Sequence, residues 1–347
     1  MNEVPDPKPH RRRPRYSGKH PRRFEDKYKE HAPERYPELI AHVRQRGMTP
    51  AGQHVPIMVE EVLATLAPRA GDRGVDATLG YGGHARRFLD RIRPGGQLLG
   101  LDADPIELPK TVERLRGLDH DEQALLARRT NFASLGATLC EVGWNDGVDF
   151  LFADLGVSSM QIDDPTRGFA FKHDGPLDMR MNPSRGVSAA QWLERATFEQ
   201  IKTALRENAD EAYADPLALA LAGRRASLRT TRELAELIHS ALPRLDDDGT
   251  DLVVRRVFQA LRIQVNDEFG VLEALLRQIP DALRSGGRAA VLTFHSGEDR
   301  RVKKAFERAC AAGQFAEVSD GVVRASFDER RANPRSGPAK LRWARKA

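Results

Sequence analysis

An acid and a glycine turn at a fixed spacing are the residues of this chain whose types most directly suggest chemistry. Asp102 follows the apolar run 97–101 and lies twenty residues beyond Gly82, which stands in a turn with Gly83 just before His84. In doubly wound folds such a turn lets a ligand approach the backbone, and an acid at about this spacing binds two ribose hydroxyls. We therefore predict a cofactor that contains a nucleoside.

The same turn has other interpretations. A lone glycine turn between a strand and a helix often serves packing alone, and this one is not the GxGxxG of dinucleotide-binding proteins. No lysine follows it at the position that grips phosphate in a P-loop. The acid at the ribose spacing is an independent feature, and it favours the cofactor interpretation.

A second acid, Asp154, follows the continuous apolar run 148–153, which is typical of a buried parallel strand. It opens a segment over 155–181 that is rich in Gly, Pro and Asp, and a loop of such length in a compact domain usually carries function. A merely solvated surface loop is the alternative. The segment offers cations for phosphate or carboxylate groups and rings for stacking, at Arg167, Arg180, Phe169 and Phe171.

A third group of polar residues follows another apolar run. A turn at 285–287 leads into the run 288–294, which delivers His295, Ser296 and Glu298 to the carboxyl edge of the expected sheet. A histidine, a serine and an acid so close together suggest a hydrolase. Adjacent side chains on an extended segment diverge, however, and the serine lacks the GxSxG elbow, so a role in positioning the substrate is favoured.

The elements that must position these residues alternate between strand and helix in the first half of the chain. Apolar spacing predicts helices over 57–66 and 105–115, and strands over 75–79 and 124–129. The last strand leads to Phe132, where a ring could pack on an adenine; a place in the core is the equal alternative.

Residues 188–280 have the pattern of helices almost throughout, with Ser188 and either Thr230 or Thr231 as caps. The longest predicted helices span 188–208 and 253–283. Because this block interrupts the alternation, we expect a doubly wound α/β sheet with an inserted helical domain. The predicted parts are a disordered basic tail over 1–46, a first part of the sheet domain over 47–160, the loop and inserted domain over 161–280, and a second part with a basic C-terminal arm over 281–347.

Charge is distributed unevenly along the 347 residues, whose net charge is +5. Residues 1–46 carry 13 Lys or Arg against 7 Asp or Glu, and residues 324–347 carry 8 against 2, so the rest of the chain is net acidic. Basic segments at both ends of an acidic body suggest contact with a polyanion. In the first segment, aromatic side chains that could stack on bases lie among the cations, at Tyr16, Phe24, Tyr28 and Tyr36.

Composition excludes several other classes. No apolar run approaches the roughly 20 residues that a membrane span needs, so we expect a soluble, cytoplasmic protein. Cys140 and Cys310 form no CxxC pair and cannot make a zinc cluster by themselves, so neither a disulfide framework nor a structural metal is indicated, and we expect both to be small buried hydrophobes. No metal site is predicted.

Several motifs together resemble one known family. Over about residues 54–342 the chain contains, in order, HVPIMVEEVL, DATLGYGGHARRFL, LLGLDADP, FADLGVSSMQIDDPTRGFAFKHDGPLDMRM, FQALRIQVNDEF and GGRAAVLTFHSGEDR. This pattern resembles the bacterial 16S rRNA cytosine-N4 methyltransferase family, known as RsmH or MraW. The segment from DLGVSS to DMRM is the most specific part.

The resemblance implies a class I methyltransferase fold, Rossmann-like and doubly wound, with an inserted helical domain. It implies S-adenosyl-L-methionine as cofactor and, as substrate, a cytidine in the decoding centre of 16S rRNA in the small ribosomal subunit. The residues that it implies for cofactor binding are Gly82, Gly83, His84, Asp102, Phe132, Asp154 and Gln161. The oligomeric state stays open, a homodimer included.

Methyl transfer to an amine needs alignment of nitrogen, carbon and sulfur rather than a metal. We expect Asp154, or a carbonyl of the turn over 155–158, to accept a hydrogen bond from the cytosine amine; a purely structural role for Asp154 is the alternative. Phe169 or Phe171 would stack on the base after it leaves its own stack. The rival functions are a DNA amino-methyltransferase, a NAD-dependent dehydrogenase, and a non-catalytic ribosome-assembly factor that binds RNA on the same fold.

Overall fold

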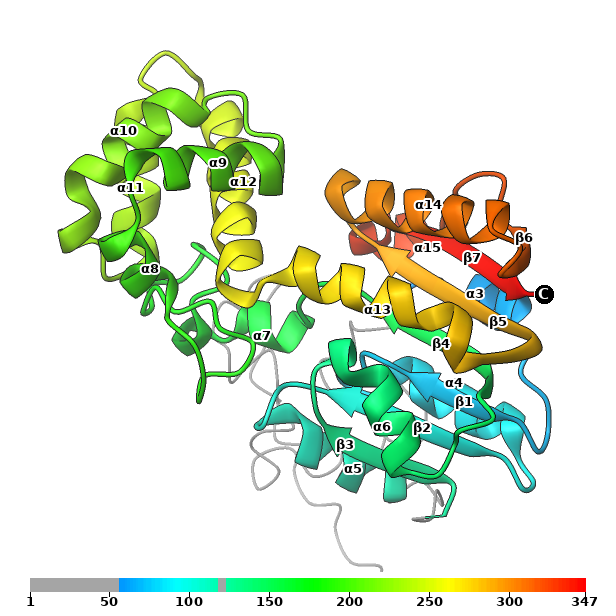
Figure 1. Cartoon of the computed structure of the whole chain (residues 1–347). Helices are drawn as coiled ribbons and strands as arrows, with labels where there is room; N and C mark the ends of the chain where they lie inside the picture. The colour runs from blue at the N-terminus through cyan, green and yellow to red at the C-terminus, as the bar shows by residue number, and fades with distance from the viewer. Residues whose placement is uncertain (1–55, 118–122) are drawn as a thin grey trace, which may run out of the picture. The chain divides into compact units, whose positions relative to one another are not determined.

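The computed structural model describes residues 56–117 and 123–347, so the predicted tail over 1–46 lies outside the described residues. Within these ranges, seven strands form one sheet in the order β3-β2-β1-β4-β5-β7-β6 (Figure 1). The first five strands in this order are parallel, and β7 runs antiparallel to both of its neighbours. The strands are β1 (Arg73–Asp76), β2 (Gln97–Asp102), β3 (Leu125–Arg129), β4 (Val148–Asp154), β5 (Leu283–Thr293), β6 (Phe315–Val318) and β7 (Lys340–Lys346).

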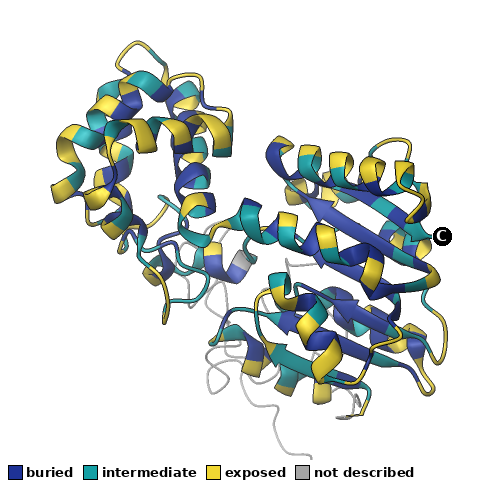
Figure 2. Cartoon of the chain, in the orientation of Figure 1, coloured by how far each residue is buried: buried dark blue, intermediate teal, exposed yellow. Residues whose placement is uncertain are grey.

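Helices cover both faces of the sheet, as the doubly wound prediction requires. One face packs against α3 (Val59–Leu66), α4 (Gly83–Ile92) and α5 (Glu107–Arg116). The other packs against α6 (Leu135–Glu141), α13 (Glu268–Ala282) and α14 (Ser296–Ala311). Figure 2 shows the central strands buried between these layers, with exposed residues on the outer sides of the helices. Coverage of both faces explains why β4 is apolar and buried from residue 150 to residue 153.

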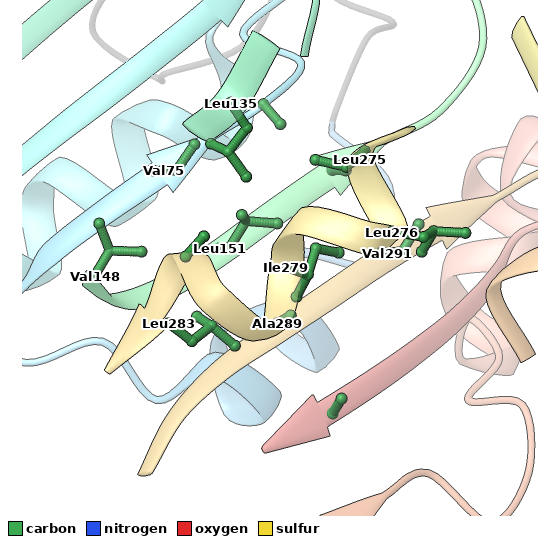
Figure 3. Packing of buried hydrophobic residues seen from close by; sticks show 14 of the residues in the cluster. Val75, Leu135, Val148, Leu151, Leu275, Leu276, Ile279, Leu283, Ala289 and Val291 are labelled. Atoms are coloured by element: carbon green, nitrogen blue, oxygen red, sulfur yellow. The ribbon is translucent and has the colours of Figure 1, made fainter. Parts of the chain in front are cut away.

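The helix α13 illustrates how the second face is closed (Figure 3). Leu275, Leu276 and Ile279 are buried in one cluster with Leu151 of β4 and Val291 of β5. Full burial of such a side chain contributes about 1.5–3 kcal/mol. Helix α13 is therefore part of the sheet domain's core.

Most of the remaining helices between β4 and α13 have a core of their own. They are α8 (Ala189–Arg195), α9 (Phe198–Ala209), α10 (Ala214–Arg224), α11 (Thr231–Ala241) and α12 (Asp247–Asn266). Two short helices lie outside this core: α7 (Ser159–Asp163) follows β4, and α15 (Phe327–Ala332) precedes β7. Ser188 and Thr230 cap α8 and α11 as predicted, each in a capping box. This cluster is the inserted helical domain, and we propose to place its end near Asp267 rather than at 280, because α13 packs on the sheet.

Two helices predicted as continuous are each divided in two. The helix predicted over 188–208 stops at Arg195, and Thr197 caps a new helix by accepting a hydrogen bond from the Gln200 N–H. The helix predicted over 253–283 breaks at Asp267, whose φ of 49° is left-handed and cannot continue an α-helix. Periodicity alone did not reveal either break.

Two predictions at the end of the chain were wrong. The turn expected at 285–287 lies inside β5, where the pairing jumps from Val148↔Leu283 to Phe150↔Arg288 and the extra residues are accommodated as an irregularity. The basic C-terminal arm expected within 281–347 is, over Lys340–Lys346, the inner strand β7, because it pairs with β5 on one side and β6 on the other. None of the helices in the described ranges is long and apolar enough to cross a membrane.

Candidate active site

Three acids on adjacent strands meet at the carboxyl edge of the sheet. In the parallel register Asp76 of β1 pairs with Gly100 of β2 and Phe152 of β4. Asp102 and Asp154 each lie two residues further along their strands, so the three carboxyl groups share one edge. Sequence analysis missed Asp76 because it extended the strand to residue 79, whereas β1 ends at the acid itself.

Asp76 is the most deeply buried of the three, with 1% of its surface exposed. Its Oδ1 accepts a hydrogen bond from the Thr78 N–H at 3.1 Å. Burial raises the pKa of Asp76 to about 7, and the neighbouring charge of Asp102 acts in the same direction. The group is therefore a carboxylic acid that titrates near neutrality.

Asp102 links the glycine turn to the end of β2. Its Oδ2 accepts from the Gly80 N–H and its Oδ1 from the Asp104 N–H, both at 2.8 Å. Burial raises its pKa to about 6, although both hydrogen bonds oppose that shift. Each carboxylate oxygen has a second lone pair, so Asp102 can still accept from two ribose hydroxyls. The site therefore fits the ribose of a nucleoside cofactor.

The glycines of the turn are required by packing as well as by any ligand. Gly82 has a left-handed φ of 79°, and a Cβ there would lie 2.9 Å from Thr111 Cγ2. A Cβ on Gly83 would lie 2.8 Å from Pro56 Cγ. The Thr111 hydroxyl donates to the Gly80 carbonyl at 2.6 Å, which fixes the turn against α5. Packing against neighbouring side chains is thus one reason for glycine at both positions. Their contact with the cofactor stays a prediction.

His84 is buried at the start of α4 and is held in one tautomer. Its Nε2 donates to the Ile57 carbonyl at 3.0 Å, so Nδ1 carries the lone pair. Nδ1 faces Asp154 Oδ2 at 3.8 Å. Burial lowers the pKa of His84 to about 4, so the ring is neutral at physiological pH. The contact with Asp154 is consequently not an ion pair.

Asp154 combines a fixed backbone with an unsatisfied carboxyl group. Its N–H donates to Thr78 Oγ1 at 2.6 Å. The side chain keeps 30% of its surface exposed, yet Oδ1 is buried and has no hydrogen-bond partner among the described residues. Burial raises its pKa to about 8, and the charges of Asp76 and Glu298 add to the shift. An orphaned buried acceptor of this kind is rare unless a ligand completes it.

Gln161 belongs to a buried polar network that starts from Asp104. Its Nε2 donates to Asp104 Oδ2 at 2.7 Å, and its Oε1 accepts from the Ser158 N–H at 3.0 Å. Arg167, which is also buried, donates to the same Asp104 oxygen at 2.8 Å and to the Met181 carbonyl at 2.9 Å. Arg167 therefore anchors the loop after β4 to the loop after β2, rather than being free for a ligand's phosphate.

The other loop residues singled out in the sequence are also engaged in the fold. Arg180 forms a two-pronged contact with Asp178, at 2.8 and 2.7 Å. Phe169 is buried in the core of the helical domain, and the Phe171 ring lies 5.6 Å from that of Phe258. Sequence patterns could not reveal the surroundings of the two rings, because their partners lie in other helices, whereas Asp178 stands only two residues before Arg180.

Phe132 opens a single turn of 3-10 helix over Phe132–Ser134, just after β3. Its ring is partly buried against the cluster that contains Leu135 and Leu272. The core interpretation of this ring is thus supported, and its contact with an adenine stays a prediction.

His295 and Glu298 complete the edge at the end of β5. His295 Nε2 lies 3.2 Å from Glu298 Oε1, and Glu298 Oε2 accepts from the Phe294 N–H at 2.9 Å. Burial alone would raise the pKa of Glu298, but the hydrogen bond and charge of His295 lower it overall. Ser296 Oγ lies 3.0 Å from Asp210 Oδ2 instead of bonding His295, which rules out a serine–histidine pair.

Neither cysteines nor metal ligands contribute to this edge. Cys140 is exposed and Cys310 is half-buried, so the expectation that both are buried was wrong. In the described ranges, no three His, Cys, Asp or Glu side chains are arranged to hold a metal ion.

A doubly wound sheet with a glycine turn and a ribose-type acid at its carboxyl edge, together with an inserted helical domain, is the class I methyltransferase architecture. Residues 51–347 match the model of the MraW methylase family, and the chain belongs to that family. The cofactor is S-adenosyl-L-methionine.

The chain is similar over nearly its whole length to several ribosomal RNA methyltransferases. It is 46% identical to ribosomal RNA small subunit methyltransferase H 1 of Lachnoclostridium phytofermentans, over 97% of this chain and 93% of that protein. It is 46% identical to the protein of the same name from Agathobacter rectalis, over 99% of this chain and 100% of that protein. Ribosomal RNA small subunit methyltransferase H 2 of Alkaliphilus metalliredigens is 45% identical, over 97% of each chain.

Proposed function

We propose that this protein transfers a methyl group to the exocyclic N4 amine of a cytidine in the decoding centre of 16S rRNA, in the cytoplasm. The observation that supports it most is the orphaned Oδ1 of Asp154, which lies at the carboxyl end of β4, separated only by β1 from the strand β2 that ends at Asp102. The names of the relatives support an RNA of the small ribosomal subunit as substrate. The resemblance of the motifs to the cytosine-N4 methyltransferase family supports the choice of nitrogen.

The residues at the carboxyl edge of the sheet would have different roles in the reaction. S-adenosyl-L-methionine supplies the methyl group. Asp102, oriented by the hydrogen bond that it accepts from the Gly80 N–H at 2.8 Å, would hold the ribose end and so fix the direction of transfer. His84, neutral and bonded to Ile57, gives the site an uncharged wall beside Asp154. Catalysis is then chiefly the alignment of nitrogen, carbon and sulfur for in-line displacement.

Asp154 would act on the cytosine amine itself. The nitrogen lone pair is delocalised into the ring, and a hydrogen bond from the amine to Oδ1 favours the pyramidal nitrogen that attacks. The pKa of about 8 keeps Asp154 protonated at neutral pH in the free protein, but a positive charge bound beside a carboxyl group lowers its pKa. When the amine nitrogen accepts the methyl group that S-adenosyl-L-methionine would supply, its proton would move to Oδ1 of the ionised Asp154 carboxylate.

The proposal predicts that Asp154→Ala abolishes methylation while the fold is retained. The assay incubates the full chain with isotope-labelled S-adenosyl-L-methionine and small ribosomal subunits from cells that lack the gene, then digests the rRNA to nucleosides. Label on N4-methylcytidine with the wild type and none with the variant is expected. Full activity of the variant would remove Asp154 from the mechanism.

A non-catalytic assembly factor on the same fold is the alternative function. It would bind the small subunit without needing the cofactor. Titration calorimetry with S-adenosyl-L-methionine separates the two functions, because binding is required for the methyltransferase and absence of binding would favour the assembly factor. Matched titration of Asp102→Ala shows whether the binding uses the predicted site.

A further inference from the structure

A groove lies between α13 and α14, on the outer side of the helices that cover one face of the sheet. Its volume is about 670 Å³. Its floor includes the small or apolar residues Pro280, Ala305 and Ala309, which leave room for an extended ligand to approach. The outer turns of both helices are exposed along their length (Figure 2).

Positive charge dominates the rim of this groove. The rim carries five cations and one acid, namely Arg277, Arg300, Arg301, Lys304 and Arg308 with Glu273. Among the described residues, no carboxylate lies within salt-bridge distance of Arg277, Lys304 or Arg308, and all three side chains are exposed. These three charges are therefore available to an external anion.

The cations of α14 have a regular spacing. Arg300, Lys304 and Arg308 stand at i, i+4 and i+8, so they share one side of the helix about 6 Å apart along its axis. Like charges at i and i+4 destabilise a helix, so this row is unfavourable for the isolated protein. Bound phosphates at the comparable spacing of a nucleic-acid strand would offset the repulsion.

Side-chain contacts link the groove to the candidate active site at the end of the groove where Arg300 and Arg301 lie. Arg300 donates to Asp210 Oδ1 at 3.0 Å, and the same Asp210 carboxylate bonds Ser296 at the edge of the sheet. Arg301 lies 3.5 Å from the ring centroid of Phe269, and that ring lies 5.8 Å from the ring of His295. A nucleic-acid strand that runs along the row of cations on α14 thus reaches the carboxyl edge of the sheet, where the candidate active site lies.

We propose that the groove between α13 and α14 binds the phosphate backbone of the substrate RNA, next to the nucleotide that enters the active site. This inference rests on the proposed function in taking RNA as the partner. The row of cations, open to solvent and far longer than one phosphate, suits a polynucleotide better than a free nucleotide.

The test compares the wild type with the triple variant R277Q/K304Q/R308Q. These side chains are exposed and unpaired in the described structure, so the variant keeps its fold. The matched control is R87Q/R91Q/R93Q, three exposed arginines on or at the end of α4, which covers the opposite face of the sheet. Binding of 16S rRNA transcribed in vitro is measured by fluorescence anisotropy over a range of salt concentrations.

The logarithm of the association constant falls linearly with the logarithm of the salt concentration. In the groove variant this negative slope should become smaller in magnitude by about 2–3, since each phosphate contact contributes about 0.7–0.9. Each contact corresponds to a factor of about 4–5 at 0.15 M salt relative to 1 M, so affinity should fall about 100-fold. In methylation of small subunits, KM should rise while kcat and the affinity for S-adenosyl-L-methionine stay within twofold. The control should match the wild type.

An unchanged slope and affinity in the groove variant would overturn the inference, and so would an equal loss in the control or failure of the wild type to bind the transcript. The methylation assay reports separately on the proposed function. If the wild type binds RNA through the groove but methylates no cytidine, the proposed function is refuted, and the inference that the groove binds RNA is retained.

Discussion

Replacement of Asp76 by asparagine should change how the stability of the protein depends on pH. The pKa of Asp76 is about 7 in the folded protein, against an ordinary value of 3.8, chiefly because of burial. A raised pKa means that the folded state binds the proton more tightly, so stability is greatest below about pH 4 and is lost as the pH rises toward 7. A shift of roughly three pKa units corresponds to about 4 kcal/mol.

Asparagine has no proton to lose and keeps an oxygen that can accept from the Thr78 N–H. The Asp76→Asn variant should therefore exceed the wild type in free energy of unfolding by only about 1 kcal/mol near pH 4.5, and by about 4 kcal/mol at pH 8. Urea unfolding of the cofactor-free protein between these pH values measures the difference.

Asp146→Asn provides the matched control. Asp146 is exposed and its pKa is lowered, chiefly by a hydrogen bond from Arg284. Its contribution to stability is present above its ordinary pKa and is lost only as the pH falls below that value, so the control's difference from the wild type should be constant from pH 4.5 to 8. A difference for Asp76→Asn that is equally constant would refute the reasoning.

Three further substitutions test the supports of the site. Arg167→Met leaves Asp104 as a buried unpaired charge and should destabilise the protein by about 3–5 kcal/mol, measured by urea unfolding; a change below about 1 kcal/mol would show that the pair contributes little. Gly82→Ala forces a Cβ against Thr111 at a left-handed φ and should cost about 1–3 kcal/mol, seen as a lower Tm, whereas an unchanged Tm would mean that the turn adapts. Asp102→Ala should weaken S-adenosyl-L-methionine binding by about 100-fold in calorimetry through the loss of two charge-assisted hydrogen bonds, and unchanged affinity would remove it from the cofactor site.

Local patterns in the sequence were sufficient for much of the fold. The glycine turn and Asp102 are linked by a hydrogen bond between residues 22 positions apart, and both belong to one strand–helix–strand unit that periodicity can detect. The alternation of strand and helix, interrupted by a helical block, likewise predicted the doubly wound sheet with its insert.

Other features depend on contacts that no local pattern contains. The end of β1 at Asp76 is set by its register against two neighbouring strands. Asp104 joins Gln161 and Arg167, which lie 57 and 63 positions away. The segment over Lys340–Lys346 is basic like an arm, and only pairing with β5 and β6 makes it an inner strand.

The most direct test of the central claim is the nucleoside composition of 16S rRNA in cells with and without the gene. Mass spectrometry of digested rRNA from the deletion strain should show the loss of one N4-methyl group from one cytidine. The wild-type gene should restore it, and the Asp154→Ala gene should not. Identical nucleoside composition in the two strains would contradict the proposed function.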